Sequence, residues 1–113
     1  MSVSDSNRRR TAWTLALAAV LAATNASAAE HVVAQKGKAF STKKLKIKVG
    51  DSVKFVNEDP FSHNVFSLSA AKSFDLGSYP QGGAKNVSFD KAGTVEVECA
   101  IHPDMTLTVE VEK

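Results

Sequence analysis

The chain of 113 residues contains a single cysteine, Cys99, so no disulfide can form within it. No stretch repeats apolar residues with the period of a helix over several turns. The longest apolar run, Leu15–Ala23, falls well short of the roughly 18 residues that a permanent membrane-spanning helix needs. These absences argue against a disulfide scaffold, a helical bundle and an integral membrane protein.

The N-terminus has the three parts of an export signal in the expected order. A basic head, Arg8–Arg10, precedes the apolar run, and the small residues Ala26–Ala28 follow it as a cleavage site. We therefore predict a signal peptide at residues 1–28, a folded domain at residues 29–113 and a periplasmic location. The paired arginines suggest twin-arginine export, but the residues after them match that signal poorly, so the general secretory (Sec) route stays open.

An excess of charge of either sign is also lacking. The whole chain has a formal charge of +2, and cleavage would remove three arginines and Asp5, leaving eleven basic and eleven acidic residues. A neutral domain argues against nucleic-acid binding, which needs a net basic face.

A domain of about 85 residues has a core of marginal stability. Because disulfides are excluded, a bound metal is the next candidate for stabilising it.

Alternation of apolar and polar residues dominates the rest of the chain and predicts strands. In one run, Leu45, Ile47 and Val49 share a face and lysines occupy the other. We expect strands at residues 43–49, 52–57, 63–69, 85–89, 94–99 and 106–111, preceded by one near Val32 and Val33. Short strands with frequent turns predict an all-β fold, an antiparallel sandwich of about seven to eight strands.

Glycines and prolines suggest how the strands connect. Gly50-Asp51 predicts a hairpin between residues 43–49 and 52–57, and the glycines and proline from Gly77 to Gly83 predict a long irregular connection. The lysines of residues 43–48 could form a docking patch. Their more common role on the open face of a strand is to keep a sheet edge from pairing with other chains.

The segment from Cys99 to Met105 concentrates side chains that bind metals. Cys99 shares a strand face with two valines, which points its thiol toward the core. Met105 has the same parity as the apolar residues of the last strand, so both sulfurs are expected on core-facing sides of one short loop, with His102 between them. The fourth ligand has to come from elsewhere, and His63, at the start of a strand, is the candidate.

Two imidazoles, a thiolate and a distant thioether form the ligand set of a copper electron-transfer site. We therefore predict that His63, Cys99, His102 and Met105 bind one copper ion. Each residue alone could be an ordinary core or surface residue, and their joint occurrence favours the metal site. Zinc with Asp104 as an oxygen donor in place of Met105 is the alternative that the soft sulfurs disfavour.

At these residues the chain resembles the cupredoxins, or blue copper proteins, and the loop spacing is similar to that of their amicyanin- and plastocyanin-like members. The resemblance runs from about Val32 to the end of the chain and is carried by Val49–Asn57, His63–Val65, Ala92–Val95 and Cys99–Met105. It implies a Greek-key β-sandwich, a type 1 copper held by the four predicted ligands, and transfer of single electrons between larger redox proteins. It also implies that Asn64 ties the ligand-bearing segments together by hydrogen bonds and that the exposed edge of His102 is the electron's exit.

The expected function is that of an exported electron carrier, with copper storage or delivery by the same fold as the alternative. An enzyme is not expected, because copper oxidases and reductases of related fold need a second copper centre and only His31 is left. Expected partners are redox proteins, for example a c-type cytochrome or a dehydrogenase, docking transiently on a monomer around His102, Ile101 and Pro103. Neither nucleic acid nor a membrane span after cleavage is expected.

His31 allows one further hypothesis about the mature N-terminus. Cleavage after Ala28 would make Ala29-Glu30-His31 the new terminus. Its amine, two amides and imidazole could bind a second Cu(II) in a square plane. A solvated terminal histidine without metal is the favoured alternative.

Overall fold

The computed structural model of the protein describes residues 27–113, which form eight β-strands. The strands are β1 (Glu30–Gln35), β2 (Lys44–Lys48), β3 (Ser52–Asn57), β4 (His63–Ser69), β5 (Lys72–Tyr79), β6 (Ala84–Ser88), β7 (Gly93–Cys99) and β8 (Thr106–Glu112). The expected all-β fold of seven to eight strands is confirmed. None of the described residues forms a helix that could span a membrane. The predicted signal peptide, except for Ser27 and Ala28, lies outside the described residues.

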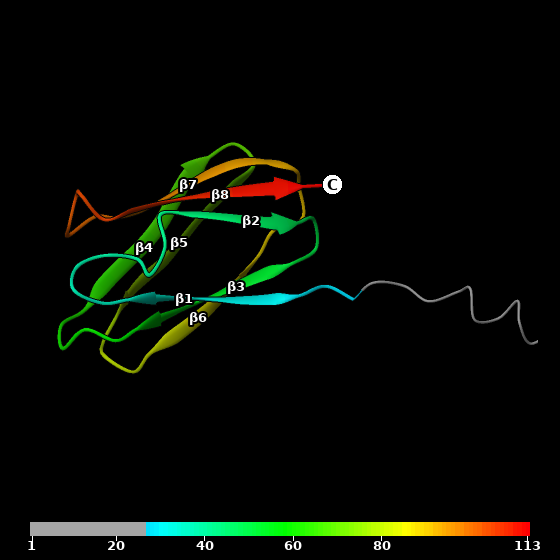
Figure 1. Cartoon of the computed structure of the whole chain (residues 1–113). Helices are drawn as coiled ribbons and strands as arrows, with labels where there is room; N and C mark the ends of the chain where they lie inside the picture. The colour runs from blue at the N-terminus through cyan, green and yellow to red at the C-terminus, as the bar shows by residue number, and fades with distance from the viewer. Residues whose placement is uncertain (1–26) are drawn as a thin grey trace, which may run out of the picture.

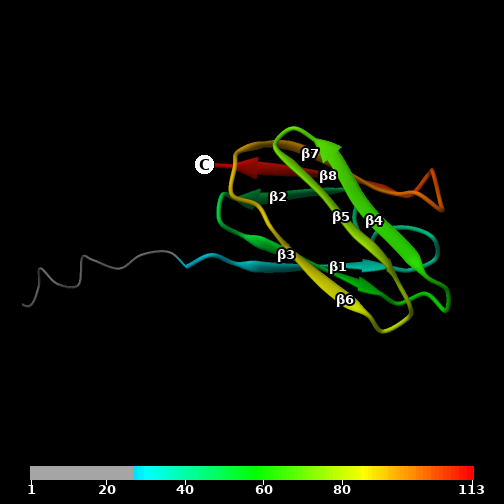
Figure 2. The same cartoon turned by 180° about the vertical axis from the view of Figure 1, so that it is seen from behind.

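The strands form two sheets that pack face to face (Figures 1 and 2). One sheet has the strand order β1-β3-β6, and the other has the order β2-β8-β7-β4-β5. Four pairings are antiparallel, but β1 pairs with β3, and β2 with β8, in parallel. The expectation of an antiparallel sandwich was wrong for these two pairs, because side-chain alternation is the same in strands of either direction.

The core lies between the two sheets and takes every second side chain of each central strand. Val53 and Phe55 of β3 are fully buried from one sheet, and Val95 and Val97 of β7 are fully buried from the other. Full burial of each such side chain contributes about 1.5–3 kcal/mol to folding. The packed core therefore fixes the positions of the central strands β3 and β7.

β2 and β3 do not form the predicted hairpin. β2 pairs with β8 in the five-stranded sheet, and β3 lies in the three-stranded sheet. The chain crosses between the sheets at Gly50, whose φ of 99° favours glycine and whose amide donates to the carbonyl of Phe89 at 2.8 Å. A hairpin and a crossing both turn Ile47 and Phe55 into the same core, so alternation alone could not distinguish them.

The predicted irregular connection is also partly wrong, because its first residues belong to β5. β5 pairs with β4 in antiparallel register, with Tyr79 opposite His63. The register shifts between Asn64, which pairs with Ser78, and Phe66, which pairs with Asp75, so the extra residue of this bulge is in β5, where Gly77 has a φ of 73°. A glycine inside a strand often marks a bulge, and the sequence alone did not separate that role from a turn.

The connection between β7 and β8 lies at one end of the sandwich, and the connection between β2 and β3 lies at the other (Figures 1 and 2). The hydrogen bond from the Val49 amide to the Glu112 carbonyl agrees with this placement, because it joins the second connection to the far end of β8. β4 starts at the same end as the β7–β8 connection. The predicted ligands therefore gather at one end.

Candidate metal centre

Cys99 ends β7 and points into the core. Its strand partner across the sheet is Val65 of β4, and the side chain is only 2% exposed. It is a free cysteine, because the chain contains no second cysteine with which it could form a disulfide. A buried thiol at the end of a strand has a position fixed by the sheet rather than by a mobile loop.

His63 reaches Cys99 through the pairing of β4 with β7. It begins β4 two residues before Val65, so its side chain lies on the same face of the sheet as Cys99. Diagonal neighbours on antiparallel strands lie within reach of long side chains. His63 is completely buried, and its Nδ1 lies 3.7 Å from the Cys99 sulfur. The register of one strand pair thus brings together two residues that are 36 positions apart.

The connection from β7 to β8 adds His102 and Met105. The ladder between these strands runs to Glu98 opposite Thr106, so Cys99 and Met105 occupy its next position. The loop is closed by a hydrogen bond of 2.9 Å from the Met105 amide to the His102 carbonyl. The Nδ1 atom of His102 lies 3.8 Å from the Cys99 sulfur, and Met105 is 1% exposed.

The spacing of the nitrogen and sulfur atoms is that of a trigonal metal site. A ring nitrogen of His63, the sulfur of Cys99 and a ring nitrogen of His102 lie within 4.8 Å of one another. With bonds of about 2.0 Å to nitrogen and about 2.3 Å to sulfur, a planar trigonal site separates these two atoms by about 3.7 Å. The observed 3.7 and 3.8 Å agree with this value. The residues therefore fit a single metal ion, and the thiolate favours copper.

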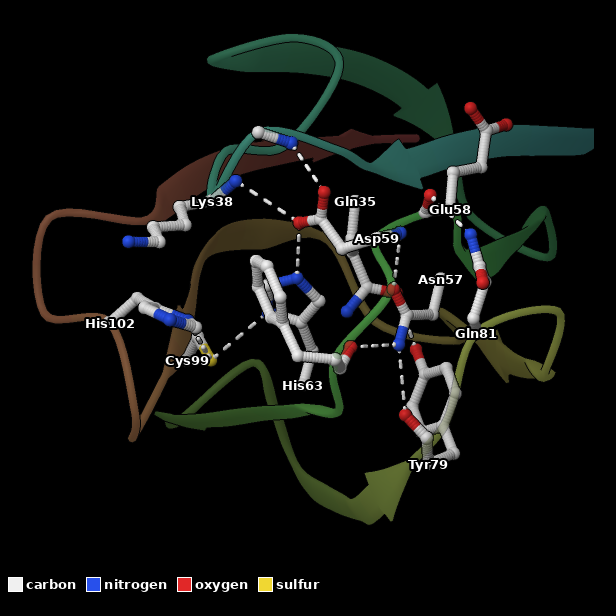
Figure 3. A network of polar contacts seen from close by, with 12 residues as sticks. Gln35, Lys38, Asn57, Glu58, Asp59, His63, Tyr79, Gln81, Cys99 and His102 are labelled. Carbon is white, nitrogen blue, oxygen red and sulfur yellow. Dashed lines mark hydrogen bonds and ion pairs between the residues drawn. The ribbon is translucent and has the colours of Figure 1, made fainter.

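Asp59 orients His63 from the side that faces away from Cys99 (Figure 3). Its Oδ2 lies 2.7 Å from Nε2 of His63, so the imidazole ring stands between the carboxylate and the thiol. An ionised carboxylate only accepts hydrogen bonds, so Nε2 carries the proton donated to Asp59, and in the neutral ring Nδ1, on the side of Cys99, is the nitrogen that can bind a metal. This is the tautomer that a metal ligand needs.

The Asp59 carboxyl stays ionised although it is buried. Loss of solvent raises its pKa, but the hydrogen bonds with His63 and with the amides of Lys38 and Gly37 lower it, and the net pKa lies below the ordinary value. The two amides donate over 2.7 Å from Gly37 and 3.1 Å from Lys38. In the sequence, Asp59 was not among the candidate site residues. The missed signal was an acidic residue four positions before a predicted ligand.

Asn57 holds the segment that leads from β3 to His63. Its side chain is completely buried, donates to the carbonyls of Phe61 at 2.8 Å and Tyr79 at 3.0 Å, and accepts from the Asp59 amide at 2.8 Å. The resemblance implied that Asn64 makes such ties. Within residues 27–113 the Asn64 side chain forms no hydrogen bond, and its backbone pairs with β5. The expected role therefore belongs to Asn57 and Asp59.

Phe61 packs against both imidazole rings. Its ring centroid lies 5.3 Å from that of His63 and 5.5 Å from that of His102, and the two imidazoles are 5.0 Å apart. Phe61 is 37% exposed and Ile101 is 53% exposed, while His102 is partly exposed. The centre is thus closed toward the core, and His102 is its side chain nearest to solvent.

Comparison with known proteins shows which family the chain belongs to. The description "copper binding proteins, plastocyanin/azurin family" belongs to a family model that matches residues 27–112. The chain belongs to this family. Copper is accordingly the cofactor of this cupredoxin, in agreement with a donor set of two imidazoles and a thiolate.

Two curated relatives match part of the cupredoxin. It is 35% identical over 68 residues to the methylamine utilization protein MauL of Methylorubrum extorquens, an alignment that covers 59% of this chain and 60% of MauL. It is 32% identical over 80 residues to amicyanin of Paracoccus denitrificans, which covers 65% of this chain and 58% of amicyanin. The cupredoxin thus spans about three fifths of the length of these relatives.

Solved structures show the same fold. The Cu(I) form of an amicyanin variant has a TM-score of 0.68 at 28% identity and covers 80% of this chain and 88% of that one. The copper-containing nitrite reductase of Thermus scotoductus has a TM-score of 0.70 at 28% identity, but the match covers 74% of this chain and only 22% of the reductase. The cupredoxin therefore corresponds to one portion of that larger enzyme.

His31 lies at the other end of the sandwich from the ligand cluster. Its Nε2 is 2.9 Å from Oδ2 of Asp51, and the Ala29 amide donates to Oδ1 of the same carboxylate at 2.9 Å. Glu30 pairs with Ser52 in the first position of the β1–β3 ladder. A square-planar Cu(II) site at residues 29–31 would need the Ala29 nitrogen, which here bonds to Asp51, and the second copper stays an untested prediction.

Proposed function

We propose that the protein is an exported carrier of single electrons with one type 1 copper, whose ligands are His63, Cys99, His102 and Met105. When bound, the copper supplies the redox chemistry by accepting and releasing one electron. The observation that carries the proposal is the trigonal spacing of the two imidazole nitrogens and the thiol. Met105 would supply the weaker thioether ligand, because it is buried at the ladder position next to Cys99.

The burial of the ligands favours electron transfer over copper storage or delivery. His63, Cys99 and Met105 are each at most 2% exposed, and Asp59 holds the ring of His63 from behind. Ligands fixed in this way move little when an electron arrives, which keeps the reorganisation small and the transfer fast. A delivery protein needs its ligands to open so that the metal can leave.

His102 and its apolar surroundings support the proposed route for electrons and partners. Ile101 and Phe61 expose apolar surface on the side of the centre where His102 meets solvent. We assign this surface as the contact for redox proteins such as a c-type cytochrome or a dehydrogenase. Interfaces of this class are small, below about 1,200 Å² in total, so the complexes of a monomeric carrier dissociate between transfers.

Export to the periplasm, with a signal peptide at residues 1–28 and a mature domain at residues 29–113, is part of the same proposal. It is supported by the basic head, the apolar run and the small residues that precede position 29. A role without enzymatic activity is proposed because only one histidine, His31, remains outside the ligand set, whereas copper enzymes of related fold use a second copper centre.

The proposal is tested by adding Cu(II) to the exported, processed protein and recording its visible and electron paramagnetic resonance spectra. We expect intense thiolate-to-copper absorption, which Cys99→Ser should abolish and His63→Ala should weaken or alter. Met105→Leu should keep the colour and shift the reduction potential. His31→Ala is the matched control, because it removes a histidine bonded to a carboxylate at the other end of the sandwich. A colourless copper complex of the unaltered protein would refute the proposal.

Kinetics separate an electron carrier from a delivery protein. Stopped-flow mixing of the Cu(I) protein with an oxidised c-type cytochrome should show electron exchange that is fast compared with loss of copper to a chelating acceptor. Transfer of the metal itself to the acceptor, ahead of any electron exchange, would instead establish delivery as the function.

A further inference from the structure

We infer that Asp59 is a positioning residue that sets the reduction potential of the copper centre, because its buried carboxylate on His63 stabilises Cu(II) relative to Cu(I). The inference rests on the proposed function. It concerns a residue that does not touch the metal and acts through the imidazole between them.

The contact between Asp59 and His63 is short and shielded from water. The oxygen and nitrogen atoms are 2.7 Å apart, Asp59 is 4% exposed and His63 is completely buried. In such surroundings a hydrogen bond to a charged group is strong, because water neither competes for it nor screens it. The imidazole is therefore held in one orientation, with Nδ1 on the side of Cys99.

The negative charge of Asp59 is not cancelled by a neighbouring cation. Among residues 27–113 its side-chain hydrogen-bond partner is the imidazole of His63, and its remaining contacts are the backbone amides of Gly37 and Lys38. The ammonium group of Lys38 points away from the carboxylate in Figure 3. A full negative charge thus remains on the far side of a ligand ring.

The loop between β1 and β2 is shaped to hold this carboxylate. Gly37 and Lys38 have φ values of 66° and 60°, and Lys38 is the one non-glycine residue of the described chain with a positive φ. A lysine in this region carries a backbone cost, which persists only where surrounding contacts enforce it. The contacts that accompany this conformation are the hydrogen bonds from the two consecutive amides of Gly37 and Lys38 to Asp59. The loop thereby connects a distant part of the chain to the metal centre.

The expected direction of the effect follows from charge. A histidine ligand that donates its other N–H to a carboxylate becomes more basic, and such partners change metal affinity by about 10- to 100-fold when they are mutated. A more basic ligand near a fixed negative charge favours the ion of higher charge. Asp59 should therefore strengthen Cu(II) binding more than Cu(I) binding and lower the reduction potential.

Asp51 supplies a matched control within the same chain. Its carboxylate also accepts two backbone amides, those of Ala29 and Lys48, and also bonds Nε2 of a histidine, His31. It is similarly buried, at 6% exposure, but lies in the β2–β3 connection at the opposite end of the sandwich. Loss of either carboxylate should destabilise the fold, but only loss of Asp59 should change the copper.

The experiment compares potentiometric titrations of the copper-loaded wild-type protein, Asp59→Asn and Asp51→Asn. We expect Asp59→Asn to change the ratio of Cu(II) to Cu(I) affinity about tenfold in favour of Cu(I), a rise in potential of about 59 mV for one electron. Asp51→Asn should keep the wild-type potential, and Asp59→Glu, which retains the charge, should stay closer to wild type than Asp59→Asn. Equal potentials in wild type and Asp59→Asn would overturn the inference.

A second measurement keeps the inference falsifiable if Asp59→Asn does not fold. In the Cu(I) protein, proton NMR should show the His63 Nε2 proton as a slowly exchanging, strongly downfield signal, as its hydrogen bond to a buried carboxylate requires. Absence of that signal would overturn the positioning role. A wild-type protein without thiolate-to-copper absorption would instead refute the proposed function itself, so the two failures remain distinguishable.

Discussion

Removal of the Asn57 side chain tests how the segment before His63 is held. Asn57→Ala deletes three hydrogen bonds of a buried side chain, of 2.8, 3.0 and 2.8 Å, to the carbonyls of Phe61 and Tyr79 and from the amide of Asp59. Each such bond contributes about 1 kcal/mol net, and unsatisfied buried partners add to the loss. We therefore expect the free energy of unfolding of the copper-free protein to fall by about 3 kcal/mol.

The assay is urea unfolding of the copper-free protein, followed by far-ultraviolet circular dichroism. Copper should be absent because a metal that binds only the folded state would add its own stabilisation and mask the change. Asn64→Ala is the control, since that side chain makes no hydrogen bond in residues 27–113 and should cost less than about 0.5 kcal/mol. Equal losses in the two variants would refute the assignment of the tie to Asn57, and a larger loss in Asn64→Ala would assign it to Asn64.

Two further predictions concern pH and docking. Hydrogen bonds from the Ala29 amide, from His31 and from the Lys48 amide lower the pKa of Asp51 from 3.8 to about 2, so its contribution to stability is complete above about pH 3.8 and is lost as the pH falls toward 2. The difference in unfolding free energy between wild type and Asp51→Asn should therefore shrink over this interval in acid titrations of the copper-free protein, and a constant difference would contradict the pairing. Ile101→Glu should slow electron exchange with a redox partner in stopped-flow measurements without removing copper or colour, because Ile101 is exposed beside His102; an unchanged rate would exclude this surface as the contact.

Strand positions were largely predictable because they depend on neighbouring residues. The alternation of Leu45 and Ile47 with lysines marked β2, and the strands around Cys99 and Met105 were found within one or two residues of their observed ends. The partners of the strands were not predictable in the same way. β2 joins β8 in one sheet and β3 joins β1 in the other, although both hairpin and crossing bury the same side chains.

The candidate ligands also divide into those that local sequence predicts and one whose position depends on strand pairing. Cys99, His102 and Met105 stand close together in the sequence, and the parity of the flanking strands already turned both sulfurs inward. His63 could be proposed from its residue type and the family resemblance, but its contact with Cys99 depends on the β4–β7 register. Asp59 was missed although it lies four positions before His63, and its burial against the amides of residues 37 and 38 could not be read from the sequence.

The sequence by itself determined seven of the eight strands, with β5 missed, the inward direction of the sulfur side chains and the chemistry of the donor set. These properties follow from periodicity and residue type, which are local. Only the tertiary structure decided which strands are neighbours, that the Nδ1 of His63 lies 3.7 Å from the thiol, and that a buried carboxylate stands behind that ring. Such contacts join segments far apart in the chain, and their formation depends on the free energy of the whole packed core rather than on any one segment.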